Sequence, residues 1–453
     1  MENLSLNRRQ FLIGTGALLS LSTLQSSGVP IYDHLDHKKV ALIGAGWYGK
    51  SDLFRLLQVS NVEVVAVCDV DENHLEEAAI LISQRQGSKK QPKKYNDYRE
   101  LLANHQLDIV LIGTPDHWHA LQAIAAIQAG ANVYLQKPIS VDVLEGEAIV
   151  AAARKHNKKV QVGTQRRSTP HMIDAKENVI EKGLLGNISH VEMCCYYHMK
   201  SKANPSEQPV PDFLDYEMWT GPAPLRPYDG IPHGGWWRAF MEYGNGIPGD
   251  MCVHMFDTVR WMLNLQWPKK ISATGGSYVQ KGGKSNIADT QTAIFEYEEL
   301  NCVWTHRTWG TPSDPDYPWA FIVYGDQGTL KGSTMKYEFI PTKGEPILKN
   351  VIYEKEEFPE DLNEPRIELN AAPATRRHML DLLAAIKNDE LPIADVLQGH
   401  ISTACCILAN ISMELDRAVQ YDPINKICID DPEATAKLKR TYRSPWKHPS
   451  HTT

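Results

Sequence analysis

No segment of this 453-residue chain is an uninterrupted apolar run of about 20 residues, the length that a membrane-spanning helix needs. The composition also lacks extremes, since 30 Gly and 27 Pro are ordinary and no block of like charges occurs. This excludes collagen-like, coiled-coil and disordered chains. Basic residues are not in excess, because 47 Lys and Arg stand against 55 Asp and Glu. The formal net charge of −8 therefore disfavours a nucleic-acid partner.

The cysteines form no metal-binding or redox pattern. The eight of them include no C-x-x-C pair and no zinc-like double pair. A chain long enough for about three average domains can bury a large core without disulfides. We therefore expect the cysteines to be mostly small apolar residues of the core.

The start of the chain has the layout of an export signal. Arg8 and Arg9 lie just before residues 11–24, a 14-residue stretch of mainly apolar residues diluted by Gly, Ser and Thr. The stretch is too short to span a bilayer, and the paired arginines are typical of the twin-arginine route for folded proteins. No A-x-A cleavage site follows, and a disordered start is the alternative. We expect residues 1–27 to be a signal, and the protein to be periplasmic without stable membrane insertion.

Residues 38–165 alternate apolar runs with amphipathic segments. The run 40–43 is followed by a glycine turn, a helix over 51–59 and a second run over 62–67. This order predicts a parallel strand–helix–strand unit, and its continuation predicts a doubly wound domain. The further expected helices are 75–85, 98–104, 120–129 and 146–156, and the further expected strands are 108–112, 132–135 and 160–162.

After residue 165 the apolar segments are longer and alternate with polar residues, which is typical of an antiparallel sheet. Residues 205–250 are rich in Pro, Gly and Trp and predict long loops over a site. The sequence thus predicts an α/β protein in which residues 166–445 form a C-terminal α+β domain with a large, mostly antiparallel sheet. Expected strands include 189–198, 290–297, 302–308 and 321–324, and expected helices are 374–388 and 399–418.

A G-x-G-x-x-G motif follows the first predicted strand and opens the first helix. Glycines allow a tight turn and close approach of the backbone to a pyrophosphate, and the helix N-terminus adds partial positive charge. Asp69 ends the next predicted strand twenty residues after Gly49, where a carboxylate accepts hydrogen bonds from ribose hydroxyls. Its charge would repel a 2′-phosphate, so NAD is preferred over NADP. The motif consists of Gly44, Ala45, Gly46, Trp47, Tyr48 and Gly49.

Two further motifs follow predicted strands at their carboxyl ends, the edge where ligands bind in this topology. Thr114 and Pro115 precede two histidines, His117 and His119, of which we expect one to have a packing role and the other to face the nicotinamide. A helix start is the alternative role of this segment. Gln136-Lys137-Pro138 follows the strand 132–135, and a lysine there can hold and polarise a substrate hydroxyl. No metal site is expected.

A D-x-x-x-H motif precedes a predicted helix. On a helix Asp250 and His254 share one face, and Asp257 lies three residues further on. A carboxylate beside histidine raises the basicity of the imidazole and orients it, which suits a general base. For Asp257, a structural pair with Arg260 is the alternative.

These motifs resemble the Gfo/Idh/MocA family of NAD(P)-dependent sugar and inositol oxidoreductases, in its exported branch. In that family the lysine of an E-K-P motif touches the reacting hydroxyl and the D-x-x-x-H histidine acts as acid and base. The resemblance implies these roles for Lys137 and His254, with Asp250 orienting. Gln136 stands where the motif usually has Glu. The implied cofactor contacts are the glycine motif (44–49), Asp69, Thr114, Pro115, His119, Gln136 and Lys137, and further matches are residues 163–167, 219–224, 237–238 and 399–400.

The combined prediction is hydride transfer between NAD and a secondary alcohol of a sugar, sugar derivative or inositol. The expected substrate contacts are Arg167, Trp237, Arg238, Asp250 and His254, with Trp236 and Tyr243 as further stacking rings. Packing within the loop is the alternative role of the tryptophans. Two alternatives stay open: a glycosidase that uses NAD transiently, and a cofactor-retaining binding or scaffold protein. A broad antiparallel sheet with one open face also predicts a homo-oligomer.

Overall fold

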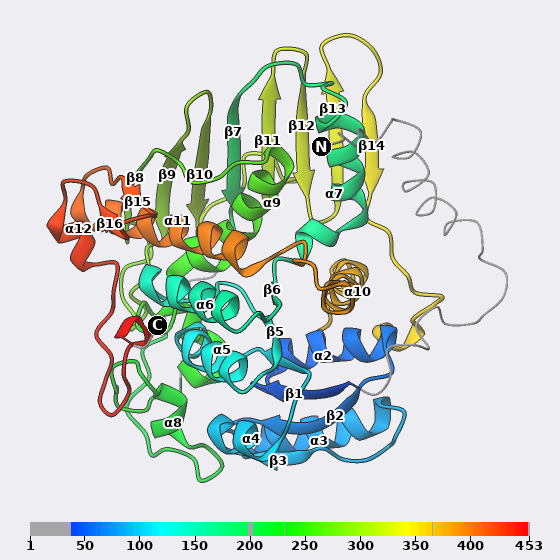
Figure 1. Cartoon of the computed structure of the whole chain (residues 1–453). Coiled ribbons are helices and arrows are strands. Elements are labelled where there is room, and N and C mark those ends of the chain that lie inside the picture. Colours follow the sequence, from blue (N-terminus) through cyan, green and yellow to red (C-terminus); the bar gives the residue numbers. More distant parts are fainter. Residues whose placement is uncertain (1–37, 198–202, 231, 365, 452–453) are drawn as a thin grey trace, which may run out of the picture.

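The computed structural model describes residues 38–451 except 198–202, 231 and 365, so the expected signal over residues 1–27 lies outside the described residues. Two large sheets dominate the described chain (Figure 1). The first is six-stranded and entirely parallel, with the order β3-β2-β1-β4-β5-β6. This confirms the predicted doubly wound arrangement. Its strands are β1 (Lys39–Ile43), β2 (Glu63–Cys68), β3 (Lys93–Tyr95), β4 (Ile109–Ile112), β5 (Asn132–Leu135) and β6 (Val160–Val162).

The central strands of this sheet are buried on both faces, which explains their continuous apolar sequences. All four residues of β4 are buried, as are Val40–Ile43 of β1. The chain order reverses between β1 and β4, and in such sheets the crevice at the carboxyl ends of these strands is where ligands bind. The connecting helices are α2 (Trp47–Val59), α3 (Glu72–Arg85), α4 (Tyr98–Asn104), α5 (His119–Gln128) and α6 (Val143–Lys155).

The second sheet has eight strands in the order β14-β13-β12-β11-β7-β10-β9-β8. All neighbours are antiparallel except β7 and β10, so the predicted mostly antiparallel sheet is confirmed. The short strands β15 (Tyr421–Asp422) and β16 (Ile427–Cys428) form a separate two-stranded sheet beside β8. The eight strands are β7 (Ile188–Cys195), β8 (Lys270–Gly276), β9 (Thr290–Glu296), β10 (Asn301–Arg307), β11 (Trp319–Gly325), β12 (Gly328–Ser333), β13 (Lys336–Pro341) and β14 (Ile347–Asn350).

Helix α11 connects the two sheets, because it packs on α6 and β6 of the first part and on β8 and α9 of the second (Figure 1). It is long and apolar enough to cross a membrane, but 78% of its apolar window is buried inside the fold. Its sequence therefore fits a core helix. The helices of the second part are α7 (Pro170–Ala175), α8 (Tyr216–Thr220), α9 (Val253–Leu263), α10 (Ala372–Asn388), α11 (Val396–Leu415) and α12 (Pro432–Ala436).

All eight cysteines lie in the described part of the chain, and none forms a disulfide there. Seven are buried and Cys194 is half-buried. Cys252 packs among Cys302, Cys405 and Cys406 in the core of the second part, where burial raises the pKa of its thiol. This is the apolar role expected from the sequence.

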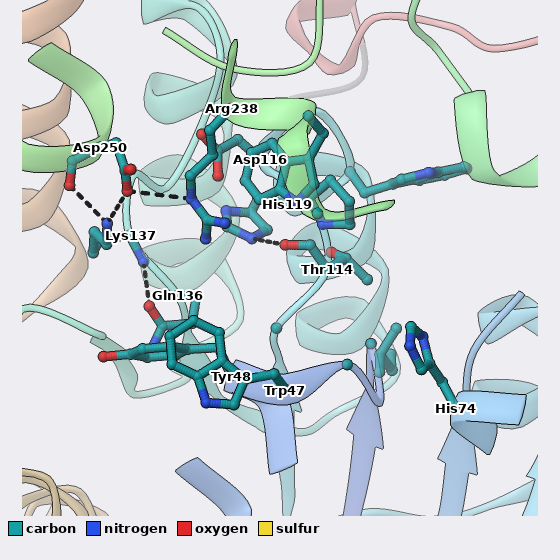
Figure 2. Close-up of a pocket in the computed structure, with 18 of the residues that line it drawn as sticks. Trp47, Tyr48, His74, Thr114, Asp116, His119, Gln136, Lys137, Arg238 and Asp250 are labelled. Carbon is teal, nitrogen blue, oxygen red and sulfur yellow. Dashed lines mark hydrogen bonds and ion pairs between the residues drawn. The ribbon is translucent and has the colours of Figure 1, made fainter. Parts of the chain in front are cut away.

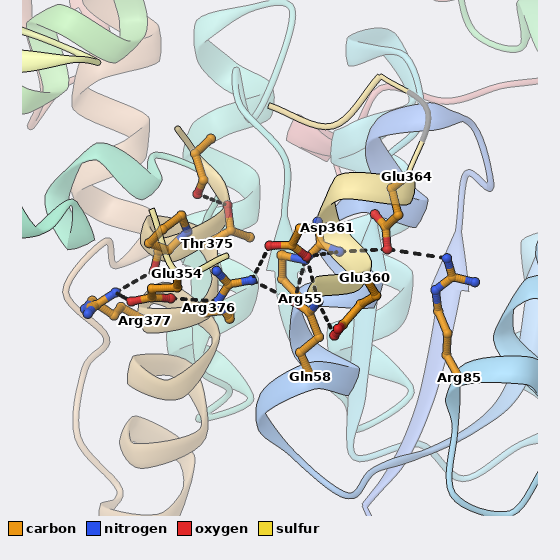
Figure 3. Close-up of polar contacts among 12 residues, drawn as sticks. Arg55, Gln58, Arg85, Glu354, Glu360, Asp361, Glu364, Thr375, Arg376 and Arg377 are labelled. Carbon is orange, nitrogen blue, oxygen red and sulfur yellow. Dashed lines mark hydrogen bonds and ion pairs between the residues drawn. The ribbon is translucent and has the colours of Figure 1, made fainter. Parts of the chain in front are cut away.

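A buried ion network joins α2 to α10 and to the segment before α10 (Figure 3). Asp361 lies between two arginines, 3.2 Å from Arg55 on α2 and 2.8 Å from Arg376 on α10. Arg55 also pairs with Glu364 at 2.9 Å, and Arg376 pairs with Glu354 at 2.9 Å. Because α2 begins at the glycine turn, this network also holds the helix that follows the turn against the C-terminal helix α10.

Replacing Asp361 with alanine is expected to destabilise the protein by about 3 kcal/mol, because two buried guanidinium groups each lose a partner. The urea midpoint of unfolding, followed by tryptophan fluorescence, measures the change. The control is Glu357→Ala, an exposed acid of the same segment, which should shift stability by less than about 0.5 kcal/mol. Equal midpoints for the two variants would contradict a structural role for the network.

Candidate active site

One large cavity lies at the carboxyl ends of the first sheet, where the second part of the chain covers it. Its volume is about 1100 Å³, and its walls come from both parts. Most of the residues predicted for the site line it, whereas Ala45, Gly49 and Arg167 do not. The predicted residues in its wall are Gly44, Gly46, Trp47, Tyr48, Asp69, Thr114, Pro115, His119, Gln136, Lys137, Trp237, Arg238, Asp250 and His254.

The glycine turn is packed tightly on one side and open on the other. Gly44 has φ +87°, and a Cβ on Gly49 would lie 2.0 Å from the Gly44 carbonyl oxygen. A Cβ on Gly46, in contrast, would meet no atom within 4 Å and would project into the cavity space. The turn therefore leaves room for a ligand at the N-terminus of α2, as the pyrophosphate of a dinucleotide requires.

Asp69 stands at the end of β2 in the cavity wall. Its Oδ2 accepts a hydrogen bond of 2.7 Å from the Ala45 N–H, and its Oδ1 accepts one of 3.0 Å from the Asp71 N–H. Ala45 itself is buried and contributes this backbone bond instead of lining the cavity. Asp69 thus braces the glycine turn and presents a carboxylate at the predicted ribose position.

The two histidines after β4 have different environments. His119 lies in the cavity wall, with its ring nitrogens 2.7 Å from the Pro138 carbonyl oxygen and 2.9 Å from that of Thr114. Burial lowers the pKa of His119 to about 4. His117 points into the core, 3.1 Å from the Trp219 carbonyl oxygen. The structure therefore places the predicted packing role on His117 and the cavity position on His119.

Lys137 is held by direct contact with Asp250 in the wall of the cavity (Figure 2). Its Nζ donates to Asp250 Oδ1 at 2.7 Å and to the Asp250 carbonyl oxygen at 2.7 Å. Gln136 supports the lysine from the other side, since its Oε1 accepts the Lys137 N–H at 3.2 Å and its Nε2 donates to Asp52 Oδ2 at 2.6 Å. A glutamate at position 136 could not donate this bond. The Gln136 amide thus matches a buried carboxyl group on α2 that the sequence analysis did not single out.

Asp52 gives this arrangement a pH-dependent stability. Burial raises the pKa of Asp52 to about 8, even though the Gln136 amide opposes the shift. The folded protein thus keeps Asp52 protonated in a range where the unfolded chain ionises it, and the resulting stabilisation is lost as pH rises towards 8. Asp52→Asn cannot ionise. The Tm of the variant minus that of the wild type should therefore be more positive at pH 8.5 than at pH 5.

A matched control is Asp97→Asn. Although burial opposes ionisation of Asp97, hydrogen bonds from Arg99 hold its pKa below the ordinary value. Its Tm difference from the wild type should be the same at pH 5 and pH 8.5, because Asp97 is ionised at both. A Tm difference for Asp52→Asn that is equally flat would show that Asp52 is ionised in the folded protein.

The expected pairing of Asp250 with His254 is wrong in this structure. Asp250 lies in a single π turn, Pro248–Cys252, just before α9, and its carboxylate contacts Lys137 and Arg238, the latter at 3.2 Å. Two cations thus engage the carboxylate that was expected to orient the imidazole. Although burial opposes ionisation, these cations hold the pKa of Asp250 below its usual value.

His254 has no carboxylate partner in the described structure and packs its ring 5.4 Å from that of Trp319. Its Nδ1 is buried without a hydrogen-bond partner. Burial lowers the pKa of His254 well below its usual value, and the nearby cations Lys137 and Arg166 lower it further. The imidazole is therefore neutral at pH 7, and its basicity is lowered instead of raised.

Arg167, expected to contact substrate, is a structural residue. Its guanidinium binds both carboxylate oxygens of Asp257, at 2.7 and 2.8 Å, and donates to the Ile393 carbonyl oxygen. Asp257 is therefore fixed by Arg167 and not by the alternative ion pair with Arg260. Arg260 donates a hydrogen bond to Ser402, which in turn donates one to Asp257. The preceding residue, Arg166, faces the cavity instead. Successive residues of the 3-10 turn Gln165–Ser168 point in different directions, and the sequence carries no signal that decides between them.

The aromatic residues predicted to contact substrate also divide into residues of the cavity and residues of the core. Trp237 lines the cavity, with the Arg238 guanidinium 4.0 Å above its ring, and Trp236 lines it with 45% exposure. Tyr243 is fully buried against His117 and the core, so its predicted contact with sugar is wrong. Trp319 on β11 and Asp116 are further wall residues that were not expected from the sequence, since Trp319 lies in no motif and Asp116 was not distinguished from the start of a helix.

One group of potential metal ligands occurs in the described part of the chain, away from the cavity. Ligand atoms of Asp142, Glu145 and His448 lie within 4.8 Å of one another. Their oxygens are already engaged, since Asp142 accepts the Arg440 N–H at 2.8 Å and Glu145 accepts the Val141 N–H at 2.8 Å. The His448 Nε2 lies 2.9 Å from Asp142. The group therefore fits a clamp that fastens the C-terminal segment to the start of α6.

Comparison with known proteins assigns the two parts of the chain to two domains of one family. The profile of an oxidoreductase family, described as an NAD-binding Rossmann fold, matches residues 38–164, and the C-terminal alpha/beta domain of that family matches residues 172–289 and 348–448. The chain belongs to the Gfo/Idh/MocA family. Its cavity is therefore formed by the cofactor-binding part and the C-terminal part that are typical of this oxidoreductase family.

Individual relatives match this Gfo/Idh/MocA protein over part of their length. The inositol 2-dehydrogenase of Salmonella typhimurium is 33% identical over 150 residues, which are 33% of this chain and 43% of the relative. A glycosyl hydrolase family 109 protein of Shewanella sp. is 27% identical over 217 residues, or 43% of this chain and 46% of the relative. The matches thus span less than half of these relatives.

Solved structures show the same fold. An oxidoreductase from Agrobacterium radiobacter, in complex with NAD+, L-tartaric acid and magnesium, superposes with a TM-score of 0.64 at 16% identity. The match covers 85% of this chain and 98% of the other. The two-part architecture is therefore shared along nearly the whole described chain.

Proposed function

We propose that this protein is an NAD-dependent oxidoreductase acting on a secondary alcohol of a sugar, sugar derivative or inositol. One observation carries the proposal: Lys137 and His254, from different parts of the chain, line the same cavity as the glycine turn. The cavity thus combines a base, a cation that can stabilise an oxyanion, and a turn that can hold a dinucleotide. Hydride transfer to or from an alcohol carbon requires these three components.

When bound, NAD would accept or supply the hydride at its nicotinamide ring. The residues of the chain handle the hydroxyl proton and charge. Lys137 Nζ, fixed by two bonds to Asp250, stabilises negative charge on the substrate oxygen. His254 lines the cavity and is neutral, so a ring nitrogen of the imidazole accepts the hydroxyl proton. Trp237 and Trp319 present apolar rings at this end of the cavity.

The preference for NAD over NADP is also part of the proposal. Asp69 presents its carboxylate in the cavity wall, and Asp71 lies in the same wall. Negative charge at this position repels a 2′-phosphate. Fluorescence titration with both nucleotides tests this preference, and absence of NAD from the purified protein together with no binding in titration would remove the proposed function.

A second candidate, a glycosidase that uses NAD transiently, is favoured by the cover over the far end of the cavity. The Phe213 carbonyl oxygen accepts the Glu72 N–H at 2.9 Å, Asp215 N–H donates to the Val70 carbonyl oxygen at 3.0 Å, and His233 pairs with Asp71 at 2.9 Å. These contacts tie the loop to the segment just after Asp69, next to the predicted ribose position, and would slow the exchange of NAD. Release of a leaving group from aryl glycosides without net NADH supports this candidate, and stoichiometric NADH opposes it.

We infer further that the protein is exported by the twin-arginine route to the periplasm, on the basis of Arg8, Arg9 and the apolar stretch after them. A cofactor held as tightly as the loop contacts suggest would suit a compartment where diffusible NAD is scarce. Cell fractionation of the wild type and of an Arg8→Lys, Arg9→Lys variant tests the route. Periplasmic accumulation of both would contradict it.

We also infer a homo-oligomer formed through the outward face of the second sheet. Along β9 the residues alternate between buried and less buried positions, and the outward positions include Ile294 at 38% exposure. Ile340 on β13 and Leu348 on β14 are likewise exposed. Light scattering coupled to size exclusion tests this inference, and a monomeric mass would contradict it.

A further inference from the structure

Arg166 is a buried cation, and two of its guanidinium nitrogens have no hydrogen-bond partner among the described residues. The residue is 2% exposed and lines the cavity. Its Nε and Nη1 have no hydrogen-bond partner. Its one ion pair is with Glu368, at 3.9 Å from Nη2, and Glu368 is 44% exposed. A buried guanidinium with unmatched donors is costly for the folded protein, and because Arg166 lines the cavity, a ligand bound there could supply the missing acceptors.

Arg166 lies at the reacting end of the cavity. Its guanidinium is 5.4 Å from the ring of Trp319, which in turn is 5.4 Å from the ring of His254. Arg166 is also among the cations that lower the pKa of His254. The guanidinium therefore lies near the proposed general base, and it also acts electrostatically on Tyr48 of the glycine motif.

The other two cations at this end share one carboxylate. Lys137 and Arg238 both contact Asp250, at 2.7 and 3.2 Å. Asp116 does not balance Arg166, since burial raises the pKa of Asp116 well above its usual value and favours the uncharged acid. Arg166 is thus the cation for which the described residues provide no carboxylate within hydrogen-bond distance.

We propose that Arg166 binds a carboxylate group of the substrate, so that the substrate class is a sugar acid, such as a uronate, or a similarly acidic polyol. This inference rests on the proposed oxidoreductase function and names the substrate class for the same site. The planar guanidinium matches a carboxylate with two parallel hydrogen bonds. Binding would fix the alcohol carbon relative to Lys137, and it would place a negative charge near His254, which raises the basicity of the imidazole.

The test uses matched substrate pairs that differ only in the charged group. NAD-loaded protein is assayed with D-glucose and D-glucuronate, D-galactose and D-galacturonate, and the corresponding methyl glycosides, at constant ionic strength. We expect kcat/KM for at least one acid to exceed that of its neutral partner by about 10- to 100-fold. In Arg166→Gln this ratio should fall to nearly one, and Arg166→Lys should restore part of it.

Ligand-induced shifts of Tm provide a readout independent of turnover. The acid that reacts should raise the Tm of the wild type and not that of Arg166→Gln. In the absence of ligand, Arg166→Gln should be at least as stable as the wild type, because it removes unmatched donors. Arg417→Gln is the matched control, a surface arginine paired with Asp431, and should keep the acid preference.

The outcomes separate the two proposals. Protein that binds NAD but binds or oxidises only the neutral members, or binds no acid of the panel at 50 mM, would overturn the carboxylate site and leave the proposed function standing. A loss of NAD affinity in Arg166→Gln that is the same with every substrate present would assign the guanidinium to the cofactor. This result would also overturn the carboxylate site. Protein that binds no nucleotide would overturn the proposed function itself.

Discussion

Lys137→Met is expected to lower kcat by about a thousand-fold or more, because the variant loses the cation that stabilises the developing alkoxide. Methionine keeps the unbranched apolar stem, so the wall of the cavity changes little in shape. The loss should fall mainly in kcat, since the charge on the oxygen develops in the transition state. Stopped-flow absorbance of NADH with a reacting sugar measures the step directly.

A second variant separates the lost cation from the carboxylate that it leaves behind. Lys137 is one of two cations on buried Asp250, so Lys137→Met leaves that carboxylate with Arg238 alone. Asp250→Asn in the Lys137→Met background removes that carboxylate as well. We expect no recovery of kcat in the double variant. Recovery to within ten-fold of the wild type would mean that Lys137 serves only to neutralise Asp250.

His254→Gln is expected to lower kcat by about 100- to 10,000-fold, because glutamine cannot accept the hydroxyl proton. The wild type carries a distinctive pH dependence. Burial and the neighbouring cations lower the pKa of His254, so the imidazole stays neutral and competent as a base until the pH falls well below 6.5. The kcat/KM of the wild type should thus stay level through pH 6.5 and decline only at lower pH.

The pH profile from 4.5 to 8 checks this assignment. His254→Gln should lack the acidic decline, whereas His190→Gln, at an exposed histidine of β7, should keep the wild-type profile. An inflection at or above pH 6.5 in the wild type would contradict the depressed pKa. It would show that a carboxylate approaches the imidazole in the active protein.

The regular elements of the first sheet could be predicted closely from the sequence. The expected segments 98–104 and 132–135 coincide with α4 and β5, because apolar runs of strand length and amphipathic helices are local patterns. Helix starts were less accurate. The helix expected at 146 begins at Val143, since the Asp142 side chain caps it by accepting the Glu145 N–H, and capping geometry is decided by rotamers.

The glycine turn, the acidic strand end at Asp69 and the placement of Lys137 at a strand terminus could be predicted, because these features depend on residue type and on spacing along one element. The partners of the charged side chains, in contrast, depend on how the two parts of the chain pack together. It placed Asp250 on Lys137 and Arg238 instead of His254, and it directed Arg166 to the cavity. Charges pair through space between segments far apart in the chain, and burial sets the energy of each pair, so neither can be derived from local pattern.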